Sequence, residues 1–250
     1  MELKKSFDPV DGDILSKSSL VSHIRRAVRL YSMNGSMQGV LHLHIAGPSG
    51  RGKTFLASQL SKMLAAVIES EDFDCCVLFA PLDSFGSLKG DCWIYDVDLI
   101  SKSIVAGLAS RPAAFTVLIT EGRADNDEDV FSSISTLQGV DHSVCCVVEP
   151  DVYTWIAINV AKSKDVASSL KFPSRWNSYW KSAGSLSISK AMEKIHIDTR
   201  QAVSRWKSFP CSVVVVTNHT YAMIKEGWFD VSISEDDNII NVITNSKSNG

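Results

Sequence analysis

The amino-acid sequence predicts an α/β fold with a mostly parallel sheet and helices on both of its faces. Two observations support this prediction. Short, almost continuously apolar segments alternate along the chain with longer segments whose apolar residues recur at helical spacing. A glycine-rich stretch, residues 47–54, joins one apolar segment to one helical segment. Strands that are apolar on both sides need helices on both faces, and this is typical of parallel sheets.

The composition limits the class of protein. A chain of 250 residues is long enough for one large domain, or one domain with appendages. The hydrophobic fraction of 45% and the charged fraction of 21% are ordinary for a globular protein. The formal net charge of −3 gives no overall basic field, so any contact with nucleic acid must be local. We expect no membrane segment, because no apolar run is long enough and the N-terminus lacks a signal-peptide core.

The first part of the chain predicts one helix and one strand. Residues 1–15 are polar and are expected to form an irregular lead-in. From 16 to 31 the apolar residues fall on one helical face, and Asn34-Gly35 then breaks the helix. Residues 40–46 are expected to form a strand in which His42 and His44 alternate with apolar residues. We interpret these two histidines as partly buried structural residues, because they lack a convincing metal-ligand spacing.

The rest of the chain continues the alternation and closes with a hairpin. We expect further strands over residues 74–80, 115–120, 144–148 and 211–217. We expect further helices over residues 55–68, 97–108, 129–137, 152–162 and 188–207. Residues 229–233 and 239–243 flank a polar turn and predict an antiparallel hairpin. The predicted parts are an N-terminal helical appendage (1–39), a core (40–228), and a hairpin with a tail (229–250).

The glycine-rich stretch has the pattern of a phosphate-binding P-loop. Its sequence fits G-x-x-x-x-G-K-[ST] and reads Gly47-Pro48-Ser49-Gly50-Arg51-Gly52-Lys53-Thr54. Glycines allow backbone N–H groups to surround anionic oxygens, and a helix N-terminus adds a favourable partial charge. Lys53 is expected to reach the β- and γ-phosphates, and the Thr54 hydroxyl to hold Mg²⁺. The motif therefore predicts binding of ATP or another nucleoside triphosphate with Mg²⁺.

Polar residues follow the expected strands, where ligands of open parallel sheets bind. We expect Glu121 to support Mg²⁺, with Glu149 as the alternative. Asp83 is the best candidate for the carboxylate that activates the attacking water. Asn218 either senses the γ-phosphate or belongs to a turn. The interleaved cations and rings of residues 171–181 suit single-stranded nucleic acid, or else pack against the core.

Two known families resemble parts of this chain. The glycine-rich loop resembles that of uridine-kinase-type enzymes, which implies a nucleoside or nucleotide kinase as one reading. Such kinases need a lid and an acceptor site that is typically rich in arginine. Residues 163–187 could supply a lid, but Arg175 is their only arginine.

The order of elements resembles more fully the hexameric packaging NTPase of cystoviruses, the double-stranded RNA bacteriophages, which has a RecA-like core. The glycine-rich loop and four further stretches support this resemblance: residues 77–84, residues 96–105 with 116–121, residues 182–190 with the long helix that follows, and residues 211–218. Asn218 and Lys225 stand seven apart, which is the spacing we expect between that family's sensor Asn and its RNA-translocating Lys.

This resemblance implies a RecA-like P-loop NTPase that translocates single-stranded RNA as a homohexameric ring. The implied setting is a viral capsid shell in the virion or the host cytoplasm. Lys53, Asp83, Glu121 and Asn218 are the implied catalytic residues. Residues implied to contact RNA are Lys225, Lys181 and Ser185. The arginine finger expected from a neighbouring subunit has the candidates Arg123, Arg175, Arg200 and Arg205, with Lys247 as a poorer substitute.

Overall fold

The computed structural model covers the full chain. It describes residues 12–33, 39–48, 50–81, 86–89, 92–110, 115–122, 127–137, 139–152, 155, 188–218, 231–232 and 243–244.

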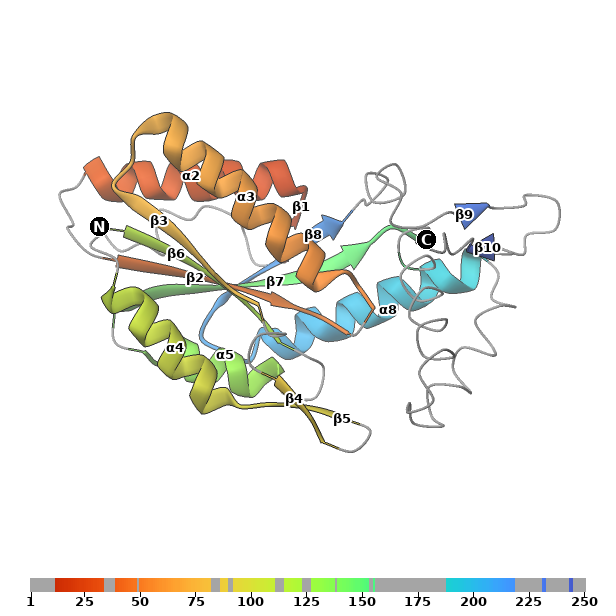
Figure 1. Cartoon of the computed structure of the whole chain (residues 1–250). Coiled ribbons are helices and arrows are strands. Elements are labelled where there is room, and N and C mark those ends of the chain that lie inside the picture. The colour runs from red at the N-terminus through yellow and green to blue at the C-terminus, as the bar shows by residue number, and fades with distance from the viewer. Residues whose placement is uncertain are drawn as a thin grey trace, which may run out of the picture.

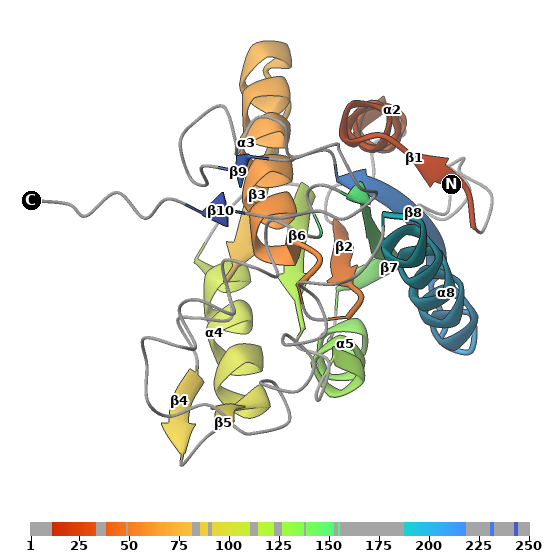
Figure 2. The same ribbon diagram turned by 90° about the vertical axis from the view of Figure 1, so that its right-hand side faces the viewer.

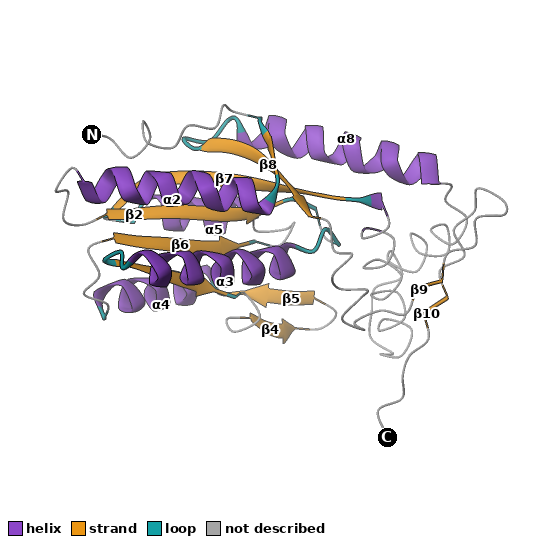
Figure 3. Cartoon of the chain, turned by 90° about the horizontal axis from the view of Figure 1, so that it is seen from above, coloured by secondary structure: helices purple, strands orange, loops and turns teal. Residues whose placement is uncertain are grey.

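A six-stranded sheet in which all neighbours are parallel forms the centre of the molecule (Figure 1). Its order is β1-β8-β7-β2-β6-β3. The strands are β1 (Ile14–Leu15), β2 (Gly39–Ala46), β3 (Cys75–Ala80), β6 (Phe115–Glu121), β7 (Val140–Pro150) and β8 (Ser212–Asn218). Seen from above in Figure 3, β2, β6 and β7 run in one direction beneath the covering helices. The predicted α/β class with a mostly parallel sheet is confirmed.

Helices cover both faces of this sheet, as Figures 1 and 2 show. On one face lie α2 (Lys17–Met33) and α3 (Lys53–Glu71). On the other lie α4 (Val97–Ala109), α5 (Asp127–Ser135) and α8 (Ile188–Trp206). The helix after β2 therefore lies on the opposite face from the helices that follow its neighbours β6 and β7. Such a reversal opens a crevice at the carboxyl ends of the strands, so the end of β2 is the expected ligand site.

Side chains of β2 point alternately to the two faces of the sheet, so this strand contacts the helices on both faces. Leu41, Leu43 and Ile45 point to the face of α2 and α3, where they join the largest apolar cluster. His42 and His44 point to the opposite face and are fully buried against α5 and α8. One strand thus supplies the main core on one side and two buried imidazoles on the other.

Smaller elements add three findings. The predicted C-terminal hairpin is confirmed in part by the antiparallel pair β9 (Val231–Ser232) and β10 (Ile243–Thr244). A second antiparallel pair, β4 (Gly86–Lys89) and β5 (Cys92–Tyr95), was not predicted. The irregular lead-in is wrong at β1, which pairs with β8. Two residues are too short for a periodic signal, and β1 exists because the edge of β8 offers it partners.

Residues 12–33 are packed into the main body of the protein. Leu20, Ile24 and Val28 of α2 are fully buried and belong to the same apolar cluster as the strands and α3. Most of the expected helix over residues 152–162 lies outside the described residues. Within the described part of the chain, every helix is too short or too polar to cross a membrane.

The packing of α2 predicts that its apolar face contributes to global stability. Ile24→Ala should lower the free energy of unfolding by about 3 kcal/mol, because it leaves a cavity in the core. Ile14→Ala is the matched control, since Ile14 is 66% exposed while Ile24 is 0% exposed. The control should change stability by less than about 0.5 kcal/mol. Urea unfolding followed by circular dichroism measures both, and equal effects would contradict this account of α2.

Candidate functional site

The P-loop lies between the end of β2 and the start of α3. Three of its glycines have positive φ angles: 127° at Gly47, 81° at Gly50 and 76° at Gly52. Side chains with a Cβ rarely adopt these angles, so the backbone path requires glycine. Gly52 is the N-cap of α3 and offers no side-chain cap, so the first-turn N–H groups of the helix are left for another acceptor. This geometry is a ready-made site for an anion.

Lys53 and Thr54 begin the helix that follows the loop. The Lys53 ammonium folds back across the loop and donates a hydrogen bond to the Gly47 carbonyl oxygen. Thr54 is exposed in the first turn. Both side chains therefore lie at the helix N-terminus, where the motif requires them. Ser49 is outside the described residues.

Arg51 points away from this anion site. Its guanidinium is 1% exposed and reaches α8, where Nη1 lies 3.2 Å from Thr199 Oγ1 and Nη2 lies 3.0 Å from Asp198 Oδ2. The Arg51 side chain connects the loop to α8. The backbone of Arg51 forms part of the loop, and its charge stabilises the contact between the loop and α8.

The sheet separates the two candidates for the magnesium-site acid. Glu121 ends β6, is 3% exposed, and lies directly opposite Ile45 of β2. Paired residues of parallel strands share a face, so Glu121 lies on the face of Ile45, which is the face of α3 and the P-loop helix start. Glu149 follows Val148, which belongs to that face, so Glu149 lies on the opposite one.

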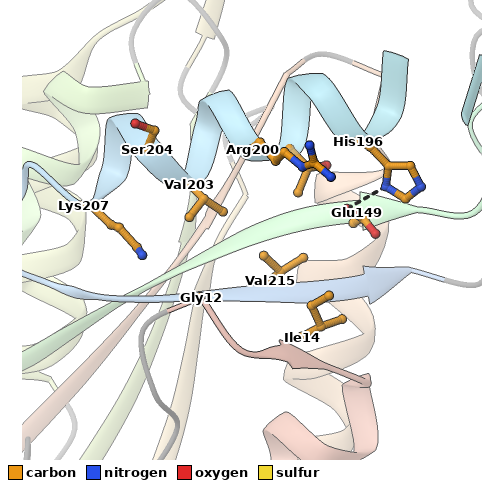
Figure 4. A pocket seen from close by; sticks show the side chains of 10 residues that line it. Gly12, Ile14, Glu149, His196, Arg200, Val203, Ser204, Lys207 and Val215 are labelled. Carbon is orange, nitrogen blue, oxygen red and sulfur yellow. Dashed lines mark ion pairs between the residues drawn. The ribbon is translucent and has the colours of Figure 1, made fainter. Parts of the chain in front are cut away.

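Glu149 lines a groove of about 560 Å³ between α8 and the strands β1 and β8 (Figure 4). Its Oε2 lies 3.7 Å from His196 Nδ1, the ion pair that Figure 4 marks. Arg200 and Lys207 also line this groove. The geometry therefore favours Glu121 over Glu149 at the P-loop, and it places the arginine-finger candidate Arg200 in the groove.

Asn218 touches the P-loop from the end of β8. It is fully buried, and its Nδ2 lies 3.5 Å from the carbonyl oxygens of both Arg51 and Gly52. Within the described part of the chain no hydrogen bond is found for Asn218 Oδ1. Asn218 therefore connects the end of β8 to the loop.

Asp127 is a functional candidate that sequence reasoning missed. It opens α5, and its carboxylate accepts hydrogen bonds from His44 Nε2 (3.1 Å) and from the Gly47 N–H (3.4 Å). Burial alone would raise its pKa, but the hydrogen bond from His44 and the charge of Lys53 lower that pKa below its usual value. Locally it is one of three acidic residues in a helical first turn, which is an ordinary capping pattern.

The remaining predicted site residues divide into two groups. Arg205 forms an ion pair with Glu128 of its own chain, on an exposed part of α8. Residues outside the described part of the chain are Asp83, Arg123, Arg175, Lys181, Ser185, Lys225 and Lys247. Among the described residues, no three His, Cys, Asp or Glu side chains group into a metal cluster.

Comparisons with known proteins add only distant likenesses. No protein-family profile and no curated relative matches this chain. The solved structure of the YGR205w protein superposes with a TM-score of 0.47 and 11% identity, over 81% of this chain and 94% of that one. The Aeropyrum pernix ORC2 protein, solved in ADPNP–ADP complexes, gives a TM-score of 0.25 and 10% identity, over 88% and 46%. Likenesses this remote support no functional argument, so the assignment rests on the site itself.

The positive φ angles predict a loop-specific effect of glycine replacement. Gly52→Ala should weaken nucleotide binding at least about tenfold, because relief of the left-handed strain turns the loop N–H groups away from the anion. Gly139→Ala is the matched control, since Gly139 also has a positive φ (96°) and a Cβ there meets nothing within 4 Å. The control should lose similar stability and keep its nucleotide affinity. Fluorescent-nucleotide titration measures affinity, and equal losses would contradict the loop assignment.

The buried guanidinium predicts a stability difference between two cations that share Asp198. Arg51→Ala should cost about 3 kcal/mol of unfolding free energy, because it breaks a buried pair. Lys194→Ala removes the other cation on Asp198, but its side chain is 36% exposed, so the cost should stay below about 1 kcal/mol. Chemical denaturation compares the two variants. A small effect of Arg51→Ala would show that the loop does not depend on α8.

Proposed function

We propose that this chain is a P-loop phosphotransferase that moves the γ-phosphate of a nucleoside triphosphate to a small acceptor. The observation that carries the proposal is the direct pairing of β6 with β2, which brings Glu121 to the P-loop within one chain. Lys53, Thr54, Glu121 and Asp127 all approach the loop from the same polypeptide. Phosphate-binding and Mg²⁺-binding residues from one subunit suit an enzyme that acts without a ring of partners.

The chain's own residues suggest how transfer proceeds. The loop N–H groups and the α3 N-terminus bind the phosphates, and Lys53 leaves the Gly47 carbonyl to neutralise the β- and γ-oxygens. The Thr54 hydroxyl and the Glu121 carboxylate are hard oxygen ligands that fit Mg²⁺. When bound, Mg²⁺ supplies charge neutralisation on the phosphate oxygens. The acceptor hydroxyl oxygen attacks the γ-phosphorus, and the bond from this phosphorus to the bridging oxygen breaks. The nucleoside diphosphate leaves with the electron pair of that bond, and the hydroxyl proton passes to water.

The two described arginine-finger candidates differ in how they are held. A finger offered to a neighbouring subunit has to be free to reach the phosphates of that subunit. Arg205 is held by Glu128 in cis, and Arg200 lines the groove on the far side of β8 and β7 from the P-loop helix.

A second candidate function is the one predicted from the order of elements. In this reading the chain is a subunit of a homohexameric, RNA-translocating NTPase of a viral capsid shell. The observation that favours it is Asn218, whose Nδ2 lies 3.5 Å from the carbonyl oxygens of Arg51 and Gly52 at the P-loop. Its RNA-contacting loop, with Lys225, lies outside the described residues.

One experiment separates the two candidates. The chain is incubated with MgATP and nucleosides, nucleotides, small hydroxy acids or single-stranded RNA, and products are followed by ³¹P NMR. Transfer to a small acceptor is the expected result. Phosphate release that RNA stimulates, with no phosphorylated acceptor and a six-fold ring in electron micrographs, would overturn the kinase in favour of the motor.

The choice of acid has its own matched test. Glu121→Gln should lower phosphoryl transfer about a hundredfold or more, because Mg²⁺ loses its carboxylate near the transferred charge. Glu149→Gln changes the same atoms on the other face of the sheet and should leave the rate within about threefold. Steady-state rates at several Mg²⁺ concentrations compare the two. A larger effect at Glu149 would refute the assignment of Glu121.

A further inference from the structure

A continuous chain of buried polar side chains runs beneath the P-loop. It crosses β7, β2 and β6 and ends at α5, with contacts of 3.2, 2.7, 3.0 and 3.1 Å. In order, the members are Ser143, His42, Thr120, His44 and Asp127. All five are no more than 6% exposed. The last member, Asp127, also accepts the N–H of Gly47, the first glycine of the P-loop.

Packing fixes the two imidazole rings and the carboxylate in this chain. The His42 ring is stacked on Phe131, with ring centroids 5.6 Å apart, and the His44 ring packs against Trp206 at 5.1 Å. A Cβ on Gly122 would lie 1.9 Å from Asp127 Oδ1, so the carboxylate occupies space that only glycine leaves. The geometry therefore holds each polar atom to a single partner direction.

For neutral rings, counting donors and acceptors leaves a single order of protons along this chain. A neutral His44 facing a carboxylate must carry its proton on Nε2, because a carboxylate only accepts. His44 Nδ1 then accepts from the Thr120 hydroxyl.

The same count of donors and acceptors gives the proton positions from Thr120 to Ser143, at the other end of the row of side chains. The Thr120 hydroxyl has one proton, which it gives to His44, so its oxygen accepts from His42 Nε2. His42 Nδ1 is left as an acceptor and takes the Ser143 proton. Every donor in the chain thus points toward Asp127, and bonds aligned in this way strengthen one another.

We propose that Asp127 is the positioning residue of the P-loop: its negative charge orders the protons of this chain and holds Gly47 and Lys53 ready for phosphate. The carboxylate joins the loop to three strands through bonds that do not depend on nucleotide. The loop and its lysine are then preorganised, which lowers the ordering cost of nucleotide binding and of the transition state. The catalytic part of this role rests on the proposed phosphotransferase function, but the proton order does not.

The proton order is tested in the wild-type chain by ¹⁵N NMR of the histidine side chains. Both His42 and His44 should show a protonated Nε2 and an unprotonated Nδ1. An Nδ1–H tautomer of either ring, or an imidazolium at His44, would overturn the proposal. This measurement needs no variant and no substrate.

The Asp127→Asn variant tests whether the charge of Asp127 sets the order of the protons. Its amide can donate to His44 Nε2 and still accept from Gly47 N–H, so all bonds survive only if both histidines change to the Nδ1–H tautomer. We expect this double tautomer change in the variant. Asp129→Asn, an exposed acid in the same helical turn, is the control and should leave both rings unchanged. Unchanged tautomers in Asp127→Asn would refute control by the charge of Asp127.

Kinetics test the positioning role. Asp127→Asn should lower kcat about tenfold to a hundredfold, because Lys53 is no longer oriented. The KM for the nucleotide should change less than about threefold, because removing a carboxylate near the phosphates offsets the lost order. Gly122→Ala, which displaces the carboxylate, should lower kcat similarly. An unchanged kcat in both variants would overturn the positioning role. If no acceptor is phosphorylated by the wild type, the proposed function fails, while fluorescent-nucleotide affinity and the tautomers still test this proposal.

Discussion

Buried polar contacts around the P-loop are the constraint on which the rest of this structure depends. The loop is held by the contact of its own Arg51 with Asp198 on α8, by Asp127 on α5 and by Asn218 on β8. Each buried polar group costs about 1–3 kcal/mol if it lacks a partner. The strands and helices that supply these partners must therefore adopt one arrangement. The geometry of the loop thus depends on the whole fold.

The alternation of side chains along each strand decides which glutamate lies on the P-loop side of the sheet. Because Glu121 shares the face of Ile45, its carboxylate lies on the side of the α3 N-terminus. Glu149 belongs to the other face and pairs with His196 in the groove beside α8. A shift of one residue in the register of β6 or of β7 against β2 would move the glutamate of that strand to the other face of the sheet. The chemistry available at the end of β2 is thus a consequence of strand pairing.

The same alternation explains the unusual composition of β2. Its odd positions join the main apolar cluster, while His42 and His44 face Phe131 and Trp206. Burial holds the pKa of His42 well below its usual value, so His42 is a neutral hydrogen-bonding group. Two histidines in a buried strand are tolerated because neighbouring strands and α5 satisfy their ring nitrogens.

The sequence by itself determined the P-loop, the alternation of strands and helices around it, and the placing of His42 and His44 on one face of their strand, because local periodicity and glycine spacing encode them. Only the tertiary structure decided between Glu121 and Glu149, and only it identified the roles of Asp127 and Arg51. Asp127 meets His44 across 83 residues, and Arg51 meets Asp198 across 147. Such contacts depend on sheet order and register, which no local pattern specifies. β1 was missed for the same reason, since two residues become a strand only beside the open edge of β8.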